Sequence, residues 1–540
     1  MSYTSFNFLM FAGITALVYF LFPLKKYQWT VLLAASFVFY LFAGYRYAAF
    51  ILFTTLTTYA SAIWMRNITR HANSVLGENK ARWDRQQKKD FKNQVRTRKR
   101  LILGTTLIVN FGILVFLKYY NFFAGSLNDV LGAFHIRFSA PTLNLLLPLG
   151  ISFYTFQSMG YLVDVYEEKV EAEENLGKVA LFVSFFPQII QGPISFYDQL
   201  AHQLYEPHRF DFTRFKYGCE LILWGFFKKL VIADRAVIAI NAVLADYLSW
   251  NGTTLAFTVL LYSLQLYTDF SGGIDISRGV AQILGIDLAE NFRRPYFAQT
   301  IQSYWHRWHI TLGAWMRTYV FYPIAMSRLF LNAGKAMKRS RFGATKAGSY
   351  LSKVLPTSLA SLIVFFLVGA WHGANWKYIA FGLWNGGIIM LSTVLEPVFE
   401  SWTAKLKLNH FPRAFGLLRM ARTFLIVLVG YVFDVAPSFT EAMQTFRLIF
   451  TCQNLSVGLA QICQLGLDWM DYGLLCMCTA IVFTVSVIQE RNSADTIRSM
   501  LDRRPFALRF VVILSGVMMV LLFGIYGPGY DAAEFVYMQF

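Results

Sequence analysis

Most of the apolar residues in this chain of 540 residues are gathered into runs long enough to form membrane helices. A helix needs about 20 mostly apolar residues to cross the hydrocarbon core of a bilayer, or somewhat fewer when neighbours shield it. The pattern therefore predicts an all-α integral membrane protein with about ten to thirteen membrane segments, some of them re-entrant. The clearest runs are Phe8–Phe22, Trp29–Phe42, Leu101–Leu117, Leu359–Val368, Leu474–Val487 and Phe510–Ile525.

The distribution of polar residues divides the expected single domain into three parts. Clean apolar runs fill both ends of the chain, whereas the middle mixes glycine, proline, tryptophan and ionisable residues into apolar surroundings. Ionisable side chains at membrane depth usually face an interior cavity or a partner, so the middle part is where we expect chemistry. The domain is 1–540, and its parts are 1–142, 143–400 and 401–540.

Two segments of the middle part, Phe185–Pro193 and Tyr267–Gly273, carry helix-breaking residues inside apolar sequence. Proline and glycine interrupt helices, and an interrupted backbone at membrane depth survives where it is buried in protein or lines water. Both segments are therefore expected either as re-entrant or interrupted helices or as packed helix ends near the interface.

Composition agrees with a membrane protein and excludes a nucleic-acid partner. Only 15% of the residues are charged, against about 25% in a soluble domain, and the mean hydropathy is +0.44. The net charge of +18 would suggest nucleic acid binding in a soluble protein, but here the basic residues lie between apolar runs, as in cytoplasmic loops. The basic segments Arg66–Arg100 and Arg328–Lys353 are expected as such loops, with an anionic-lipid site as the alternative.

Charge also predicts the orientation of the chain ends. Lys25 and Lys26 follow the first apolar run and no basic stretch precedes it, so the N-terminus is expected outside and no cleavable signal peptide is expected. Arg498, Arg503 and Arg504 precede the last run and are expected in the cytoplasm, which places the C-terminus outside as well. The five cysteines have no metal-site spacing, so no metal is expected.

His372 is the most unusual of the eight histidines. It lies in the segment Gly369–Trp376 between two apolar runs, with glycines on both sides that allow backbone or ligand to approach closely. A neutral imidazole can take a proton from a hydroxyl group near neutral pH. His372 is therefore a candidate general base, and the alternative is a histidine held by a hydrogen bond near a helix end.

A second cluster combines two histidines, His306 and His309, with the aromatic residues Trp305 and Trp308. At helical spacing Trp305, Trp308 and His309 share one face. The cluster is a candidate site, and the alternative is an interfacial belt of aromatic residues with snorkelling cations.

The segments around these histidines resemble the membrane-bound O-acyltransferase family. Gly369–Trp376 is similar to the signature around the family's invariant histidine, and Arg307–Leu312 is similar to its second histidine segment. The resemblance follows the bacterial branch that O-acetylates alginate or D-alanylates teichoic acid, although His306 and Met316–Tyr319 differ from its pattern. The other matching motifs are Leu147–Gln157, Ser184–Gln188 with Gly192–Ile194, Phe227–Lys229 with Ala233–Arg235, Leu266–Gly272 and Glu290–Tyr296.

The resemblance implies an O-acyltransferase of the bacterial cytoplasmic membrane. It would move an acyl group, preferably acetyl, from a cytoplasmic thioester donor to an extracytoplasmic acceptor, for O-acylation of a cell-surface polysaccharide or cell-wall polymer. The donor would be acetyl-CoA or an acyl carrier protein as co-substrate, with no bound cofactor, and an extracytoplasmic hydrolase-like acyltransferase would be the partner. The alternatives are D-alanyl transfer to teichoic acid, acylation of a lipid or protein, and a non-catalytic acyl or lipid transporter, because broken helices also mark transporters.

The same resemblance assigns roles to individual residues. His372 would be the catalytic base, and His309 would assist it or bind substrate. Donor and acceptor would meet in a central funnel or tunnel. The residues expected to line it are Trp305, Trp308, Trp371 and Asn375.

The end of the chain, Phe535–Phe540, resembles a Phe-x-Tyr-x-x-Phe ending found in the same bacterial branch or on its small partner proteins. There the tyrosine is implicated as a carrier of the acyl group, which points to Tyr537 as an acyl relay. A phenol has a pKa of about 10, so its ester is an activated acyl donor. The alternative is a tail whose aromatic residues anchor it at the membrane interface.

Overall fold

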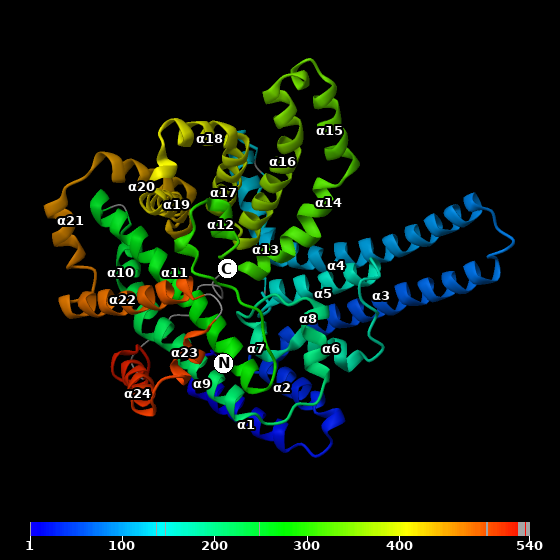
Figure 1. The fold of residues 1–540 in the computed structure, drawn as a ribbon, viewed down its shortest axis with the longest axis horizontal. Helices are drawn as coiled ribbons and strands as arrows, with labels where there is room; N and C mark the ends of the chain where they lie inside the picture. Colours follow the sequence, from blue (N-terminus) through cyan, green and yellow to red (C-terminus); the bar gives the residue numbers. More distant parts are fainter. Residues whose placement is uncertain are drawn as a thin grey trace. The chain divides into compact units, whose positions relative to one another are not determined.

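The computed structural model describes residues 2–136, 138–145, 147–247, 249–492, 495–527 and 535. Within these ranges the regular structure is helical, and the extended pairing is a single isolated bridge between Phe292 and Trp308 (Figure 1). The predicted all-α class is confirmed. The chain forms two compact units, Met1–Ile222 with Ser277–Ala289, and Leu223–Ile276 with Glu290–Phe540.

The first unit contains the N-terminal helices, and two further helices, α9 (Phe212–Phe226) and α11 (Gly252–Ile283), contribute residues to both units. The helices wholly within the first unit are α1 (Phe6–Leu21), η1 (Lys25–Tyr27), α2 (Trp29–Leu41), α3 (Tyr45–Glu78), α4 (Arg85–Ala133), α5 (Ile151–Tyr166), α6 (Leu176–Ser184), α7 (Phe186–Ile189) and α8 (Tyr197–Tyr205).

The second unit contains both candidate histidine segments. Its helices are η2 (Phe227–Ala233), α10 (Asp234–Ala245), η3 (Pro295–Phe297), α12 (Ile301–Trp305), α13 (Ile310–Met316), η4 (Arg317–Phe321), α14 (Tyr322–Ala325), α15 (Arg328–Arg339), η5 (Phe342–Ala344), α16 (Lys346–His372), α17 (Trp376–Val394), α18 (Glu396–Lys405), η6 (Leu408–His410), α19 (Pro412–Val435), α20 (Phe439–Thr451), α21 (Leu455–Ile462), α22 (Trp469–Arg491), α23 (Ile497–Asp502) and α24 (Phe506–Phe523).

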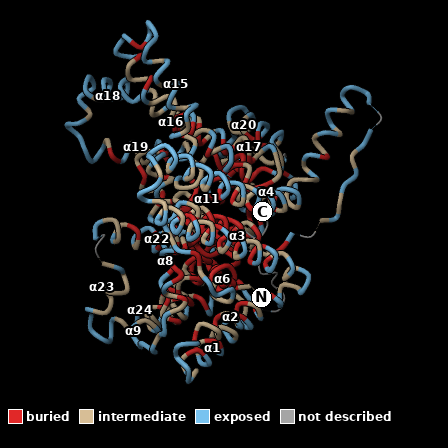
Figure 2. Tube along the Cα trace, turned by 90° about the vertical axis from the view of Figure 1, so that its right-hand side faces the viewer, coloured by how far each residue is buried: buried red, intermediate tan, exposed pale blue. Residues whose placement is uncertain are grey.

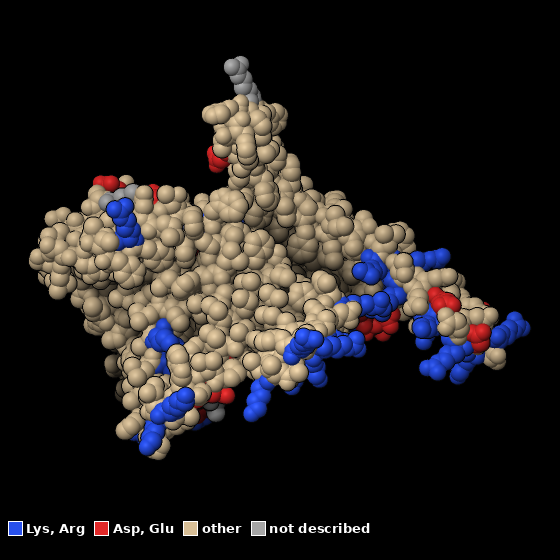
Figure 3. All heavy atoms as spheres, turned by 90° about the horizontal axis from the view of Figure 1, so that it is seen from above, with Lys and Arg blue, Asp and Glu red and all other residues tan. Residues whose placement is uncertain are grey.

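Six helices of the described residues are long and apolar enough to cross a membrane: α3, α4, α16, α19, α22 and α24. A seventh span results if α17 and α18, which meet at a bend of 61°, count as one. The predicted count of ten to thirteen segments is not confirmed. On the face drawn in Figure 3, broad areas carry no charged side chain, which suits a surface that meets lipid. In α24, for example, Phe510, Leu521 and Leu522 are all more than half exposed.

The two basic segments are helical rather than loops. Most of Arg66–Arg100 lies on the facing ends of α3 and α4, which pack against each other as a hairpin (Figure 1). Asp84 begins α4 with a capping box, since its carboxylate accepts a hydrogen bond from the backbone N–H of Gln87 at 2.7 Å. The second basic segment forms α15 and the start of α16, and α15 has no buried residue (Figure 2).

The expected break at Phe185–Pro193 is present, because α6 ends at Ser184 and the four-residue α7 follows it. The expected break at Tyr267–Gly273 is wrong, because this segment lies inside the continuous helix α11. Gly272 of this segment allows close packing of two helices instead. A Cβ at Gly272 would lie 2.9 Å from the carbonyl oxygen of Gly225 on α9, so the two backbones could not approach so closely with larger residues.

Candidate functional site

A short extended ribbon in the second unit carries His309. Phe292 and Trp308 form its bridge. The backbone N–H of Arg293 donates to the carbonyl oxygen of Arg307 at 2.9 Å, and the N–H of Ile310 donates to that of Asn291 at 3.0 Å. These bonds hold the motif Glu290–Tyr296 against the second histidine segment, Arg307–Leu312. The sequence alone predicts no role for Glu290–Tyr296.

The position of His309 at the start of α13 is strained and specifically supported. Its φ of 44° lies in the left-handed region, which costs a residue with a Cβ about 1–2 kcal/mol. The buried side chain of Asn291 offsets this cost by capping the helix. Its Oδ1 accepts hydrogen bonds from the backbone N–H of Thr311 at 3.0 Å and from the Thr311 hydroxyl at 2.6 Å.

His372 lies at the C-terminal end of α16, where the next helix approaches closely. A Cβ at Gly369 would clash with the carbonyl oxygen of Tyr378 and would lie 2.9 Å from the Cα of Gly382, so small residues allow α16 and α17 to touch. Asn375 begins α17, and its Oδ1 accepts a hydrogen bond from the N–H of Lys377 at 3.0 Å. This backbone packing holds the histidine at a helix end.

The rings of both histidines contact one tryptophan ring, that of Trp371. The ring of Trp371 is 5.8 Å from that of His309 and 5.1 Å from that of His372, measured between centroids. His309 is 1% exposed and His372 is 8% exposed. Burial, and then the electrostatic interaction with His372, lower the pKa of His309 to about 3, so His309 is neutral near neutral pH.

Phe270, on α11, contacts His309 and directly follows Asp269, which belongs to a buried cluster of charged residues. Its ring lies 4.9 Å from the ring of His309. The preceding residue, Asp269, accepts a charge-assisted hydrogen bond from Lys229 on η2 at 2.5 Å, and Lys229 also pairs with Asp234 at 2.8 Å. Buried charges need such partners. Phe270 therefore ties the position of His309 to a rigid polar core.

The other predicted lining residues have partners of their own. Trp305 donates from Nε1 to Oδ1 of Asn385 at 3.1 Å, and Trp308 stacks on Tyr304 at 5.7 Å. Trp371, by contrast, is adjacent to His372 in sequence and its ring contacts the ring of His372. The role of Trp305 and Trp308 as tunnel lining stays a prediction, as does that of Asn375.

Tyr537 lies outside the described residues. Phe535, two positions before it, is described and is fully buried. Its ring centroid lies 4.6 Å from the ammonium nitrogen of Lys229, so it is in cation–π contact with the cation that pairs with Asp234 and Asp269.

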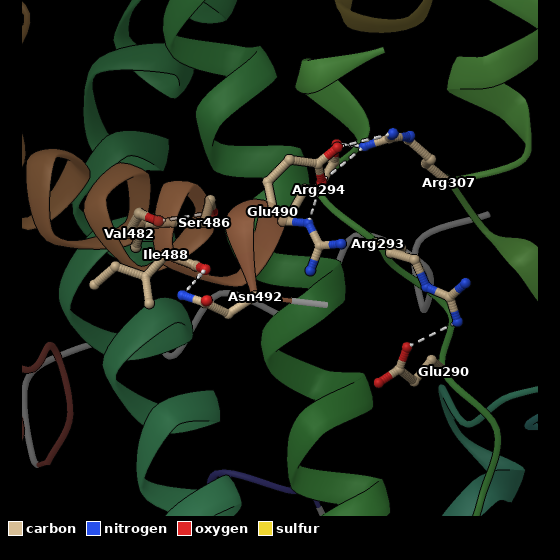
Figure 4. A network of polar contacts seen from close by, with 9 residues as sticks. All are labelled: Glu290, Arg293, Arg294, Arg307, Val482, Ser486, Ile488, Glu490 and Asn492. Carbon is tan, nitrogen blue, oxygen red and sulfur yellow. Dashed lines mark hydrogen bonds and ion pairs between the residues drawn. The ribbon is translucent and has the colours of Figure 1, made fainter. Parts of the chain in front are cut away.

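One charged residue of the site was missed from the sequence. Glu490, at the end of α22, contacts Arg294 and Arg307 of the ribbon (Figure 4). Its position next to Arg491 at the end of an apolar helix is typical of a solvated helix terminus, so the sequence offered no signal for this contact.

Comparison with known proteins shows which family and which relatives this chain is similar to. The family model described as MBOAT, membrane-bound O-acyltransferase family, matches residues 172–338. A probable alginate O-acetylase of Pseudomonas aeruginosa is 32% identical over 432 residues, which cover 79% of this chain and 70% of that protein. A peptidoglycan O-acetyltransferase of Helicobacter pylori is 32% identical over 65% of this chain and 64% of its own. A teichoic acid D-alanyltransferase of Bacillus subtilis is 29% identical over 55% of this chain and 71% of its own.

Proposed function

The chain belongs to the membrane-bound O-acyltransferase family and is a multi-pass O-acyltransferase, and we propose that it moves an acetyl group to an extracytoplasmic acceptor for O-acetylation of a cell-surface polysaccharide or cell-wall polymer. The support for acetyl is that relatives named for O-acetylation match more of this chain than the relative named for D-alanylation. The donor is a cytoplasmic thioester, acetyl-CoA or an acyl carrier protein.

The observation that carries the mechanism is that the rings of His309 and His372 both contact the ring of Trp371. The neutral imidazole of His372 takes the proton of the acceptor hydroxyl, and the oxygen attacks the thioester carbonyl. The carbon–sulfur bond then breaks, and the thiolate leaves with the proton from His372. His309 donates a hydrogen bond to the carbonyl oxygen as negative charge develops there.

A neutral His309 suits this role better than a charged one. The low pKa of His309 keeps one ring N–H as donor and the other nitrogen as acceptor throughout the physiological range. It also keeps a second positive charge away from His372, which must accept a proton at the same moment. Burial of both rings excludes water that would hydrolyse the donor.

Tyr537 is the proposed acyl relay between the membrane site and the final polymer. Its phenol would take the acetyl group from the donor with His372 as base, and an extracytoplasmic hydrolase-like acyltransferase would collect it. The buried Phe535 supports this proposal, because it holds the chain two residues before Tyr537 against Lys229. The proposal places the enzyme in the bacterial cytoplasmic membrane with both chain ends outside, as the charge distribution predicts.

The test uses purified protein with acetyl thioester labelled in the acetyl group, followed by mass spectrometry of the C-terminal peptide. Thiol release together with a gain of one acetyl group on Tyr537, absent in His372→Ala, is the expected result. Movement of intact donor without thiol release would identify a transporter instead. Thiol release and polymer acetylation with an unmodified Tyr537 would reduce the tail to an anchor, and a gain in mass from D-alanyl donor alone would overturn the choice of acyl group.

A further inference from the structure

Glu490 forms a charged clamp on the ribbon that carries His309 (Figure 4). Its Oε1 accepts a hydrogen bond from Nη2 of Arg307 at 3.0 Å, and its Oε2 accepts one from Nη1 of the same guanidinium at 3.1 Å. Oε2 also accepts a hydrogen bond from Nε of Arg294 at 2.5 Å. One carboxylate therefore holds one arginine from each of the two segments that form the ribbon.

The clamp is placed at a part of the ribbon where the backbone is strained. Arg307 is two residues before His309, and its side chain also donates to the carbonyl oxygen of Arg294 at 3.5 Å. Arg294 has a φ of 49°, so it shares the left-handed conformation of His309. Strained residues persist where their surroundings over-determine them, and Glu490 supplies part of that restraint from a different helix.

The ion pairs of Glu490 are better suited to orienting the two arginine side chains than to stabilising the folded protein. Glu490, Arg307 and Arg294 are 32%, 25% and 16% exposed, and partly exposed ion pairs contribute little to the free energy of unfolding. A two-pronged bond between a carboxylate and a guanidinium, however, sets the orientation of both groups. Fixing Arg307 in this way fixes the backbone that leads into Trp308 and His309.

We infer that Glu490 is a positioning residue that sets the ring of His309 for acyl transfer through Arg307 and the ribbon. The inference rests on the proposed role of His309 as a hydrogen-bond donor to the reacting carbonyl. A shift of about 1 Å in a reacting geometry lowers rates by about 100-fold, so a loose ribbon would reduce the chemical step without changing how the donor is bound.

The test compares Glu490→Ala with Asp495→Ala in the full-length protein purified in detergent. Asp495 is a matched control, because its carboxylate accepts two hydrogen bonds from Arg503, at 2.8 and 2.9 Å, and so holds an arginine that is not part of the ribbon. Acetyl transfer from labelled donor is measured as kcat and donor KM, and the melting temperature is measured for each variant. Glu490→Ala is expected to lower kcat by about 10- to 100-fold with a nearly unchanged KM, whereas Asp495→Ala behaves as the unaltered protein.

A double-variant cycle separates positioning from simple destabilisation. In a His309→Gln background, Glu490→Ala is expected to cause little further loss, because the residue it positions is already altered. Losses that multiply, or an unchanged kcat in Glu490→Ala, would overturn the inference. Glu490→Gln, which keeps the volume and one acceptor oxygen, replaces Glu490→Ala if the latter does not fold, and an intermediate kcat is then expected.

The cycle also distinguishes failure of this inference from failure of the proposed function. If His372→Ala abolishes transfer while Glu490→Ala does not affect it, only the positioning role is wrong. If His372→Ala and His309→Gln both retain transfer at the original rate, the histidine mechanism is wrong and no positioning role remains.

Discussion

The ring of His309 meets the ring of Trp371 edge-on, with centroids 5.8 Å apart and planes inclined by 69°. Trp371 is next to His372 in sequence and meets its ring at 5.1 Å. Both histidines therefore pack against the same indole. Contacts of this kind, between segments that are more than sixty positions apart in the chain, are what turn two histidine motifs into one site.

Replacing Trp371 should damage activity more than its burial alone suggests. Trp371→Ala removes the ring against which both histidines pack and leaves a cavity, so we expect a loss of about 3–5 kcal/mol in stability and a fall in kcat of about 100-fold. Trp371→Phe keeps an aromatic ring at this position and should lose less of both. Trp402→Ala is the control, because that indole is 57% exposed on α18. Equal activity in Trp371→Ala and Trp402→Ala would contradict a role of Trp371 in holding the two histidines.

The low pKa of His309 predicts how stability depends on pH. Between about pH 6.5 and pH 3 the unfolded chain binds a proton at this residue that the folded chain does not, so stability falls as the pH decreases. The slope from this residue is about 1.4 kcal/mol for each pH unit below 6.5. His309→Gln removes this contribution. Thermal melting of both proteins between pH 7.5 and pH 5 tests it, and parallel curves would show that His309 is protonated in the folded state.

Two glycines in the α16–α17 pair offer a matched comparison. Gly369→Ala forces a methyl group into the backbone of α17, so we expect a loss of about 1–3 kcal/mol together with displacement of His372 and lower kcat. Gly387→Ala lies in α17 with no atom within 4 Å of the added Cβ, and should be neutral or slightly stabilising. Melting temperature and donor turnover check both variants. A harmless Gly369→Ala would mean that the helices separate without affecting the site.

Much of the fold could be predicted because the signals are local. Each of the clearest apolar runs lies largely on a helix, since a membrane helix satisfies its own backbone and needs no distant partner. The structure of Tyr267–Gly273 was harder to predict. Glycine is a residue type that often interrupts a helix, whereas Gly272 lies inside a helix and allows another helix to pack closely. Its partner, Gly225, is on another helix, and nothing in the local sequence identifies it.

The candidate site, like the fold, could be predicted from the sequence only in part. His309 and His372 could be found from their motifs, and Trp371 follows from its position beside His372. Glu490 could not be found, because its partner Arg307 is 183 positions away and an acidic residue at a helix end is usually solvated. Tyr537, outside the described residues, stays a prediction.

The most direct test of the account is the rate of acetyl transfer by His372→Ala, measured with labelled thioester donor under conditions in which the unaltered protein turns over. Removal of a general base should lower kcat by about 10²- to 10⁴-fold while the variant still folds and binds donor. A His372→Ala protein that folds and transfers acetyl at the original rate would contradict the assignment of His372 and, with it, the mechanism built around Trp371.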